Sequence, residues 1–168
     1  MQTMMNIGKG QLTAIFIALA SGGALAFALT SQYVFGLLPC DLCYMQRTPY
    51  ALTLVFGTLC ALPAVRMREK RIVVAHCAAL FVLSAGFAGY HVGVEELWWA
   101  GPTSCTGGSV LSMDGLAAAL TQSASPGCEE AAFRFLGISM AGYNFAASLF
   151  LTGFCGWAMS KRAWWQNQ

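Results

Sequence analysis

Two cysteines, Cys40 and Cys43, are separated by two residues between long apolar stretches, and Arg47 follows them. Such a pair can close a disulfide, donate two electrons together, or form half of a zinc site. A zinc site usually draws four ligands from two such pairs, whereas the other spaced pair, Cys105 and Cys128, is not a CxxC. A static crosslink is also unfavourable, because closing so short a loop constrains the unfolded chain very little. We therefore interpret Cys40 and Cys43 as a redox couple that exchanges electrons with a molecule in the membrane.

The second pair of cysteines lies in the only long polar segment of the chain, residues 95–137. Within this segment, apolar residues at helical spacing over 110–120 predict a short amphipathic helix that lies on the membrane surface. The alternative is a plain loop, because the segment is short and contains Gly115. Glycine and serine residues flank the helix, so Cys105 and Cys128 stand at the two ends of an accessible loop. That placement suits a disulfide that a partner reaches and opens, although four outer cysteines allow three connectivities.

The start of the second apolar stretch bears on the reactivity of Cys43. Thr48 and Pro49 predict a helix N-cap followed by a proline at the first helical position, whereas a helix that began near Asp41 would contain Pro49. In either arrangement Cys43 lies near a helix N-terminus, and Arg47 follows four residues later. Both features favour the thiolate form of Cys43.

The composition indicates an all-α integral membrane protein. The 168 residues are 57% hydrophobic and 10% charged, whereas a soluble domain carries roughly 25% charged residues. Four apolar stretches are each near the roughly 20 residues that cross a bilayer as a helix, and they cover residues 12–38, 48–65, 72–94 and 138–160. We predict one domain over residues 1–168, a four-helix transmembrane bundle. The first stretch is too long for the apolar core of a signal peptide, so we expect it to remain uncleaved.

The charges predict the orientation of this bundle. The segment before the first span, the turn between the second and third, and the segment after the fourth carry seven basic residues and one acidic residue, a net charge of +6. The other two connections carry two basic and six acidic residues, net −4. An excess of Lys and Arg marks the cytoplasmic side, so both termini are expected there and the four outer cysteines on the periplasmic side, where disulfides persist. The few basic residues lie next to the spans, which indicates no nucleic-acid site.

Three further cysteines, Cys60, Cys77 and Cys155, lie in the inner halves of the spans, and we interpret them as small buried hydrophobic residues. His91 lies near the outer end of the third span, at the depth of the CxxC pair. A lone histidine on a face of small residues is more often a packed polar group than a ligand. Glu95 could orient His91 from four residues away, or it could be a solvated interface charge.

The segment Cys40-Asp41-Leu42-Cys43-Tyr44-Met45-Gln46-Arg47 resembles the CxxC and arginine motif of the DsbB family of bacterial disulfide bond formation proteins. The resemblance covers nearly the whole chain, and residues 135–140 resemble the start of the family's last span. Proteins similar to vitamin K epoxide reductase also combine four helices, a CxxC and quinone. In those proteins the cysteine pair of the long loop precedes the CxxC in sequence, whereas here Cys105 and Cys128 follow it.

The resemblance implies a thiol oxidase that couples a DsbA-like thioredoxin-fold protein to membrane quinone in the bacterial inner membrane. It implies that Cys105 forms the mixed disulfide with that partner, that Cys128 then exchanges with Cys40, and that Cys43 faces the quinone. The resemblance also implies that Arg47 stabilises the thiolate and the developing quinone anion.

A Tyr-His pair at the same place in the family makes His91 a candidate donor in the quinone site. The sequence leaves ubiquinone and menaquinone open. It also leaves open a specialised relative that serves one dedicated oxidant. The competing class is a non-catalytic four-span membrane protein whose outer disulfides only stabilise its loops.

Overall fold

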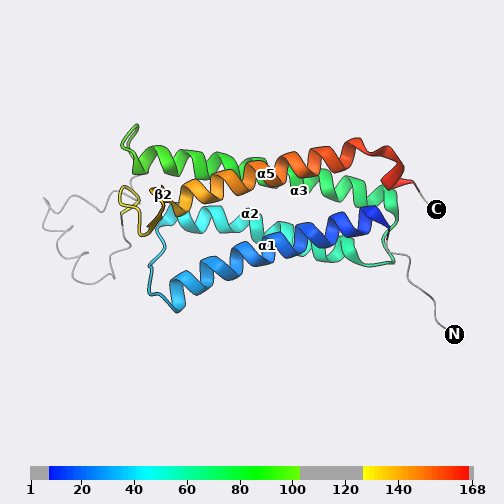
Figure 1. Cartoon of the computed structure of the whole chain (residues 1–168), viewed down its shortest axis with the longest axis horizontal. Coiled ribbons are helices and arrows are strands. Elements are labelled where there is room, and N and C mark those ends of the chain that lie inside the picture. The colour runs from blue at the N-terminus through cyan, green and yellow to red at the C-terminus, as the bar shows by residue number, and fades with distance from the viewer. Residues whose placement is uncertain (1–7, 103–126, 167–168) are drawn as a thin grey trace, which may run out of the picture.

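The computed structural model describes residues 8–102 and 127–166, which form an elongated bundle of helices (Figure 1). Its helices pack side by side, α1 against α2, α2 against α3, and α3 against α5. A two-residue antiparallel hairpin precedes α5. The predicted helix over 110–120 and Cys105 lie outside the described residues. The elements are α1 Lys9–Tyr33, α2 Asp41–Ala61, α3 Met67–Glu95, β1 Arg134–Phe135, β2 Ile138–Ser139, α5 Met140–Ser160 and the 3-10 helix η1 Arg162–Trp165.

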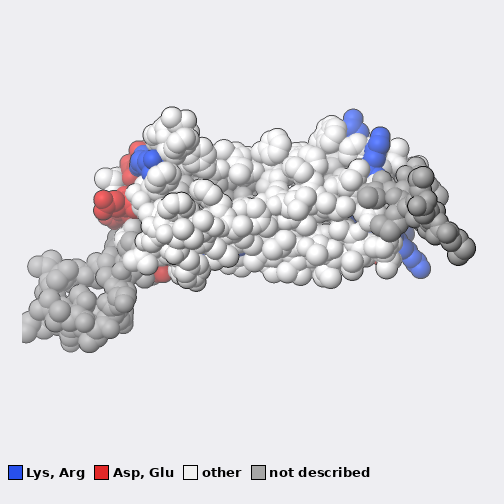
Figure 2. Space-filling model, turned by 60° about the horizontal axis from the view of Figure 1, so that its bottom comes forward, with Lys and Arg blue, Asp and Glu red and all other residues white. Residues whose placement is uncertain are grey.

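The mainly helical architecture that the sequence predicts is confirmed, and the four-span assignment is supported in part. Within the described ranges, α1 and α3 are long and apolar enough to cross a membrane. The helices α2 and α5 have no stretch of the same length that is as apolar, and polar residues within them include Gln46 and Arg47 on α2 and Asn144 on α5. Figure 2 shows an uncharged middle surface, with most of the visible Lys and Arg at one end, and most of the visible Asp and Glu at the other end beside a smaller group of basic atoms.

The helix ends differ from the predicted boundaries where local backbone chemistry intervenes. The helix α1 stops at Tyr33, and Gly36 then takes a left-handed conformation with φ of 69°, which glycine adopts without a steric penalty. Of the two starts that the sequence leaves open for the second helix, the structure has the one at Asp41, and Thr48 is not the cap. Cys40 is the N-cap, since its sulfur accepts the backbone N–H of Cys43 at 3.4 Å, and Pro49 lies inside α2.

The two halves of the bundle have different interiors. The half of the bundle nearer the two ends of the chain, which we call the inner half, holds an apolar cluster (Figure 1). This cluster contains Ile17, Phe81, Cys77 and Cys155, all fully buried. There α1 and α2 approach so closely that a side chain on Gly57 would meet the α1 backbone at 3.0 Å. The outer half holds a smaller cluster around Cys40, Leu42, Val94 and Cys128, and this cluster contains the candidate site.

Candidate functional site

The CxxC pair lies where the chain enters α2. The two sulfur atoms are hydrogen-bonded at 2.9 Å, and neither is in a disulfide. Cys40 is buried, while Cys43 is partly exposed in the first turn of the helix. The Cys40 sulfur also lies 3.6 Å from Nε2 of His91. The N-cap position of Cys40 therefore points its sulfur at both a backbone N–H and an imidazole.

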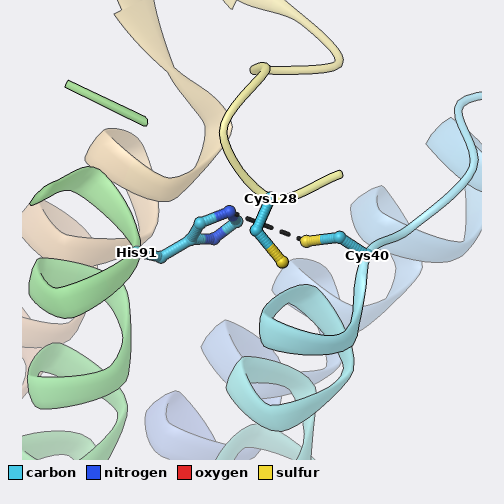
Figure 3. Close-up of side chains that lie close together, drawn as sticks. All are labelled: Cys40, His91 and Cys128. Atoms are coloured by element: carbon cyan, nitrogen blue, oxygen red, sulfur yellow. Dashed lines mark hydrogen bonds between the residues drawn. The ribbon is translucent and has the colours of Figure 1, made fainter. Parts of the chain in front are cut away.

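Cys128 lies at the same place as the CxxC pair. It is buried and disulfide-bonded. Figure 3 shows its side chain between those of His91 and Cys40, and the sulfur and nitrogen atoms of the three residues lie within 4.8 Å of one another. Three such residues could hold a metal ion, a cluster that the sequence spacing did not reveal. Because Cys128 is in a disulfide, the arrangement suits attack of one sulfur on another more directly.

The hydrogen bonds of His91 define which ring nitrogen carries its hydrogen. The amide nitrogen of Gln46 lies 2.7 Å from Nδ1, and an amide nitrogen can only donate. Nδ1 therefore accepts, and Nε2 carries the hydrogen that faces Cys40. The Gln46 amide is itself oriented by Asn144, whose Nδ2 donates to Oε1 of Gln46 at 2.6 Å.

This polar chain continues into the bundle and was missed by the sequence analysis. The hydroxyl of Ser148 donates to Asn144 at 3.4 Å and lies within hydrogen-bond distance of Ser84 and Tyr50. A signal for it exists in the sequence. Asn144 and Ser148 are four residues apart on α5, and Ser84 and His91 are seven apart on α3, so each pair shares one helix face.

The negative charge of the CxxC pair lies on Cys40, which differs from the expectation for Cys43. The pKa of the Cys40 thiol is lowered to about 4, first by the hydrogen bond from Cys43, against the opposing effect of burial, and then by His91 and the backbone N–H of Cys43. Two sulfur atoms this close cannot both carry a negative charge, so Cys43 keeps its proton. The proximity of His91, 51 residues away in sequence, was not visible from the motif.

Two cavities meet at the site. The larger, about 620 Å³, has mainly apolar walls and is also lined by Cys43, Gln46, Arg47 and His91. The smaller, about 40 Å³, is lined by Cys40, Cys43, His91 and Glu95. Cys43 is the one cysteine in the described ranges that lines both cavities, and Cys40 lines only the smaller one.

Arg47 is held at the wall of the larger cavity by the neighbouring helix. Its guanidinium donates to Oε1 of Gln32 at 2.6 Å and to the carbonyl of Ala28 at 3.5 Å, both on α1. It also lies 5.2 Å from the centre of the Tyr44 ring. These contacts hold a positive charge at the cavity that Cys43 also lines, and Gln32 is a further residue that the sequence did not indicate.

Glu95 is buried and not a solvated interface charge. Its Oε1 lies 3.7 Å from Nε2 of His91, and its side chain is 4% exposed. The expectation that Glu95 could orient His91 therefore agrees with the geometry.

A helical bundle with an apolar surface and a buried centre of neighbouring cysteines defines a class, the helical membrane proteins that carry out thiol chemistry. The family described as disulfide bond formation protein DsbB matches residues 10–158, and the chain belongs to this family. The family comprises membrane oxidases that support disulfide bond formation.

Two relatives are similar over different lengths. A protein named disulfide bond formation protein B from Stutzerimonas stutzeri (strain A1501) is 28% identical over 94% of this chain and 99% of its own length. A protein of the same name from Herminiimonas arsenicoxydans is 39% identical over 47% of this chain and 49% of its own. No solved structure matches the chain.

Proposed function

We propose that this protein reoxidises a periplasmic DsbA-like dithiol protein and passes the electrons through its two cysteine pairs to membrane quinone. The observation that carries the proposal is that Cys43 lines a large apolar cavity and is hydrogen-bonded to Cys40, whose sulfur lies close to that of the disulfide-bonded Cys128. A static four-span protein would not need free thiols next to a disulfide beside such a cavity.

The exchange begins at the outer pair, which we assign to Cys105 and Cys128. A thiolate of the partner attacks Cys105, the bond between Cys105 and Cys128 breaks, and the released electron pair leaves on Cys128. The Cys128 thiolate then attacks Cys40 of an oxidised CxxC pair, which forms the bond between Cys40 and Cys128 and leaves Cys43 as a thiolate. The closeness of the Cys40 and Cys128 sulfur atoms supports this transfer.

The larger cavity fits a quinone in size and chemistry. Small-molecule sites occupy roughly 300–1,000 Å³ and combine apolar walls with a few polar groups, as this cavity does. A quinone held there by Cys43, Arg47 and His91 would supply the acceptor for the two electrons that the cysteines deliver. Cys43 reaches this cavity directly, and Arg47 places a fixed positive charge at its wall, where negative charge develops. His91 presents Nδ1 toward Gln46 and Nε2 toward Cys40, so we assign it a role at the boundary between the cysteines and the quinone site.

We assign the protein to the bacterial inner membrane with four spans and both termini in the cytoplasm. The segregation of charged residues to opposite ends of the bundle supports this orientation. The first residues of α1 and the 3-10 helix after α5 meet at the basic end, where Lys9 lies 5.6 Å from the centre of the Trp164 ring. The cysteine site lies at the other end, on the side assigned to the periplasm.

The test is turnover of purified protein in detergent with a reduced DsbA-type thioredoxin-fold protein and ubiquinone-1, followed by loss of the quinone absorbance. We expect turnover by the wild type and none by Cys43→Ser. Cys155→Ser is the control, because it replaces a buried thiol of the inner half that lines neither cavity. Absence of turnover with ubiquinone-1 and with a menaquinone analogue, in folded protein, would favour the non-catalytic alternative. A dedicated oxidant would appear as turnover with only one of several thioredoxin-fold partners.

A further inference from the structure

Two neighbouring glutamates at the end of α3 have opposite surroundings. Glu96 is exposed and pairs with Arg134 at 3.0 Å. Glu95 is buried, and its Oε2 has no hydrogen-bond partner within the described residues. Leaving a buried polar atom unpaired costs roughly 1–3 kcal/mol, and more for a charged group. A carboxyl group held in this state needs a reason beyond stability.

The groups around Glu95 compete for one hydrogen. Nδ1 of His91 accepts from Gln46, so Nε2–H is the single donor that the ring offers, and it faces both the Cys40 sulfur at 3.6 Å and Glu95 Oε1 at 3.7 Å. When Cys40 is a thiolate, two anions would share this donor in a buried cavity of about 40 Å³. The other titratable groups that face this cavity are Cys43 and Glu130, with buried Cys128 close to Cys40 and His91.

The competition has a simple resolution that depends on the redox state. The thiolate keeps the Nε2–H of His91, and Glu95 is neutralised by a proton because its second oxygen has no other partner. When Cys40 enters a disulfide, the thiolate charge disappears. The Nε2–H group can then turn to Glu95, which is again stable as a carboxylate beside its donor.

We propose that Glu95 binds a proton when Cys40 is reduced and releases it when Cys40 enters a disulfide, acting through His91. The inference rests on the redox activity of the CxxC pair in the proposed function. Two electrons break the bond between Cys40 and Cys43. One proton goes to Cys43, Cys40 stays a thiolate, and a second proton goes to Glu95. Glu95 is a positioning residue that keeps the charge of the buried site constant during each cycle.

The test counts the protons that accompany reduction of this pair. The full-length protein carries Cys105→Ser and Cys128→Ser, so Cys40 and Cys43 are the one remaining pair of the proposed relay. It is equilibrated in detergent with reduced and oxidised dithiothreitol. The disulfide fraction is measured by alkylation and mass spectrometry between about pH 5.5 and 7.5, below the pKa of an ordinary thiol near 8.5. Dithiothreitol releases two protons with its two electrons in this range, so the pH dependence of the equilibrium constant reports the protons that the protein binds.

In the background with both substitutions, we expect an equilibrium constant for reduction that is independent of pH, because the protein binds two protons. The protein that also carries Glu95→Gln should bind only one proton on reduction, so its equilibrium constant for reduction should rise about tenfold per pH unit. Glu95→Asp should restore the flat profile. Glu96→Gln, the exposed neighbour, should match the background protein. A merely structural role for Glu95 would change the unfolding midpoint without changing the pH slope.

Two outcomes would overturn the inference alone: a tenfold slope in the background protein, or a flat profile that persists in Glu95→Gln. Failure of the background protein to form any bond between Cys40 and Cys43 would instead remove the redox premise. That outcome would overturn the proposed function together with this inference. Circular dichroism and the unfolding midpoint of each variant establish that folded protein is being compared.

Discussion

The two ends of the bundle use cysteine in opposite ways. At the outer end, Cys40 and Cys43 are hydrogen-bonded to each other, and Cys40 faces an imidazole. At the inner end, Cys77 and Cys155 are fully buried in an apolar cluster with Phe81 and Ile17. The comparison shows that residue type does not decide the chemistry. Hydrogen-bond donors near the sulfur and access to a cavity separate a redox thiol from a packing residue.

The largest expected difference in activity is between a variant that removes a sulfur at the outer end and one that removes a sulfur at the inner end. Cys40→Ala should lower quinone reduction by about a thousandfold or more, because the exchange loses the sulfur that links the two pairs. Cys77→Ala should leave turnover within about twofold and lower only stability, as expected for a small packing residue. Both are measured in the coupled assay with a DsbA-type partner. Equal losses in the two variants would contradict the division between the ends.

The next effect concerns the positive charge at the outer end. Arg47→Met keeps the length of the side chain but removes its charge and its bonds to Gln32, so we expect turnover to fall about 10- to 100-fold with a raised KM for ubiquinone-1. Arg134→Met removes a charge from the same end but away from the larger cavity, and it should have little effect. Equal kinetics of Arg47→Met and wild type would show that Arg47 is only an interface residue.

A smaller effect concerns the ionisation of Cys40. Its pKa of about 4 lies below the ordinary value of 9.0, so the thiolate is present at neutral pH and disappears only as the pH falls through about 4. The difference in thiolate ultraviolet absorbance between reduced wild type and Cys40→Ser should follow this titration. In His91→Ala the midpoint should move upward, because the thiolate loses a hydrogen-bond donor. His76→Ala, an exposed change outside the site, should leave the midpoint in place.

The smallest effect on activity is expected in the inner half. Gly57→Ala places a methyl group 3.0 Å from the α1 backbone at Ala18, and we expect a loss of about 1–3 kcal/mol in stability from overpacking. Gly23→Ala has nothing within 4 Å and should be neutral or stabilising. The kcat of both variants should stay within about twofold of wild type. A large fall in kcat for Gly57→Ala would mean that the inner half does more than hold the helices together.

The fold was predictable to the extent that apolar stretches locate helices in this chain. The stretches locate all the long helices among the described residues, but their ends depend on single residues. The first stretch continues to residue 38, whereas the left-handed conformation of Gly36 follows a helix that already ends at Tyr33. The proline signal at Pro49 was outweighed by the cap that the Cys40 sulfur provides nine residues earlier, at the start of α2.

The candidate site was predictable where its residues are close in sequence. The spacing of Cys40 and Cys43 and the helical spacing of His91 and Glu95 are local patterns, and the structure places all four residues together. The bonds that join Gln46 to His91 and Asn144 connect three different helices. Their pairing depends on how the helices pack, which the sequence of any one helix does not specify.

The position of Cys43 between the two cavities has a consequence for the reagents that can interfere with this protein. Its neighbour Cys40 lines only the small cavity near acidic groups, whereas Cys43 also lines the large apolar one. A lipid-soluble oxidant in the large cavity therefore meets Cys43, whereas Cys40 is buried beside a cavity of about 40 Å³, which is too small to admit a thiol the size of glutathione. Reagents that inactivate the pair are therefore expected to be lipid-soluble and to modify Cys43 before Cys40.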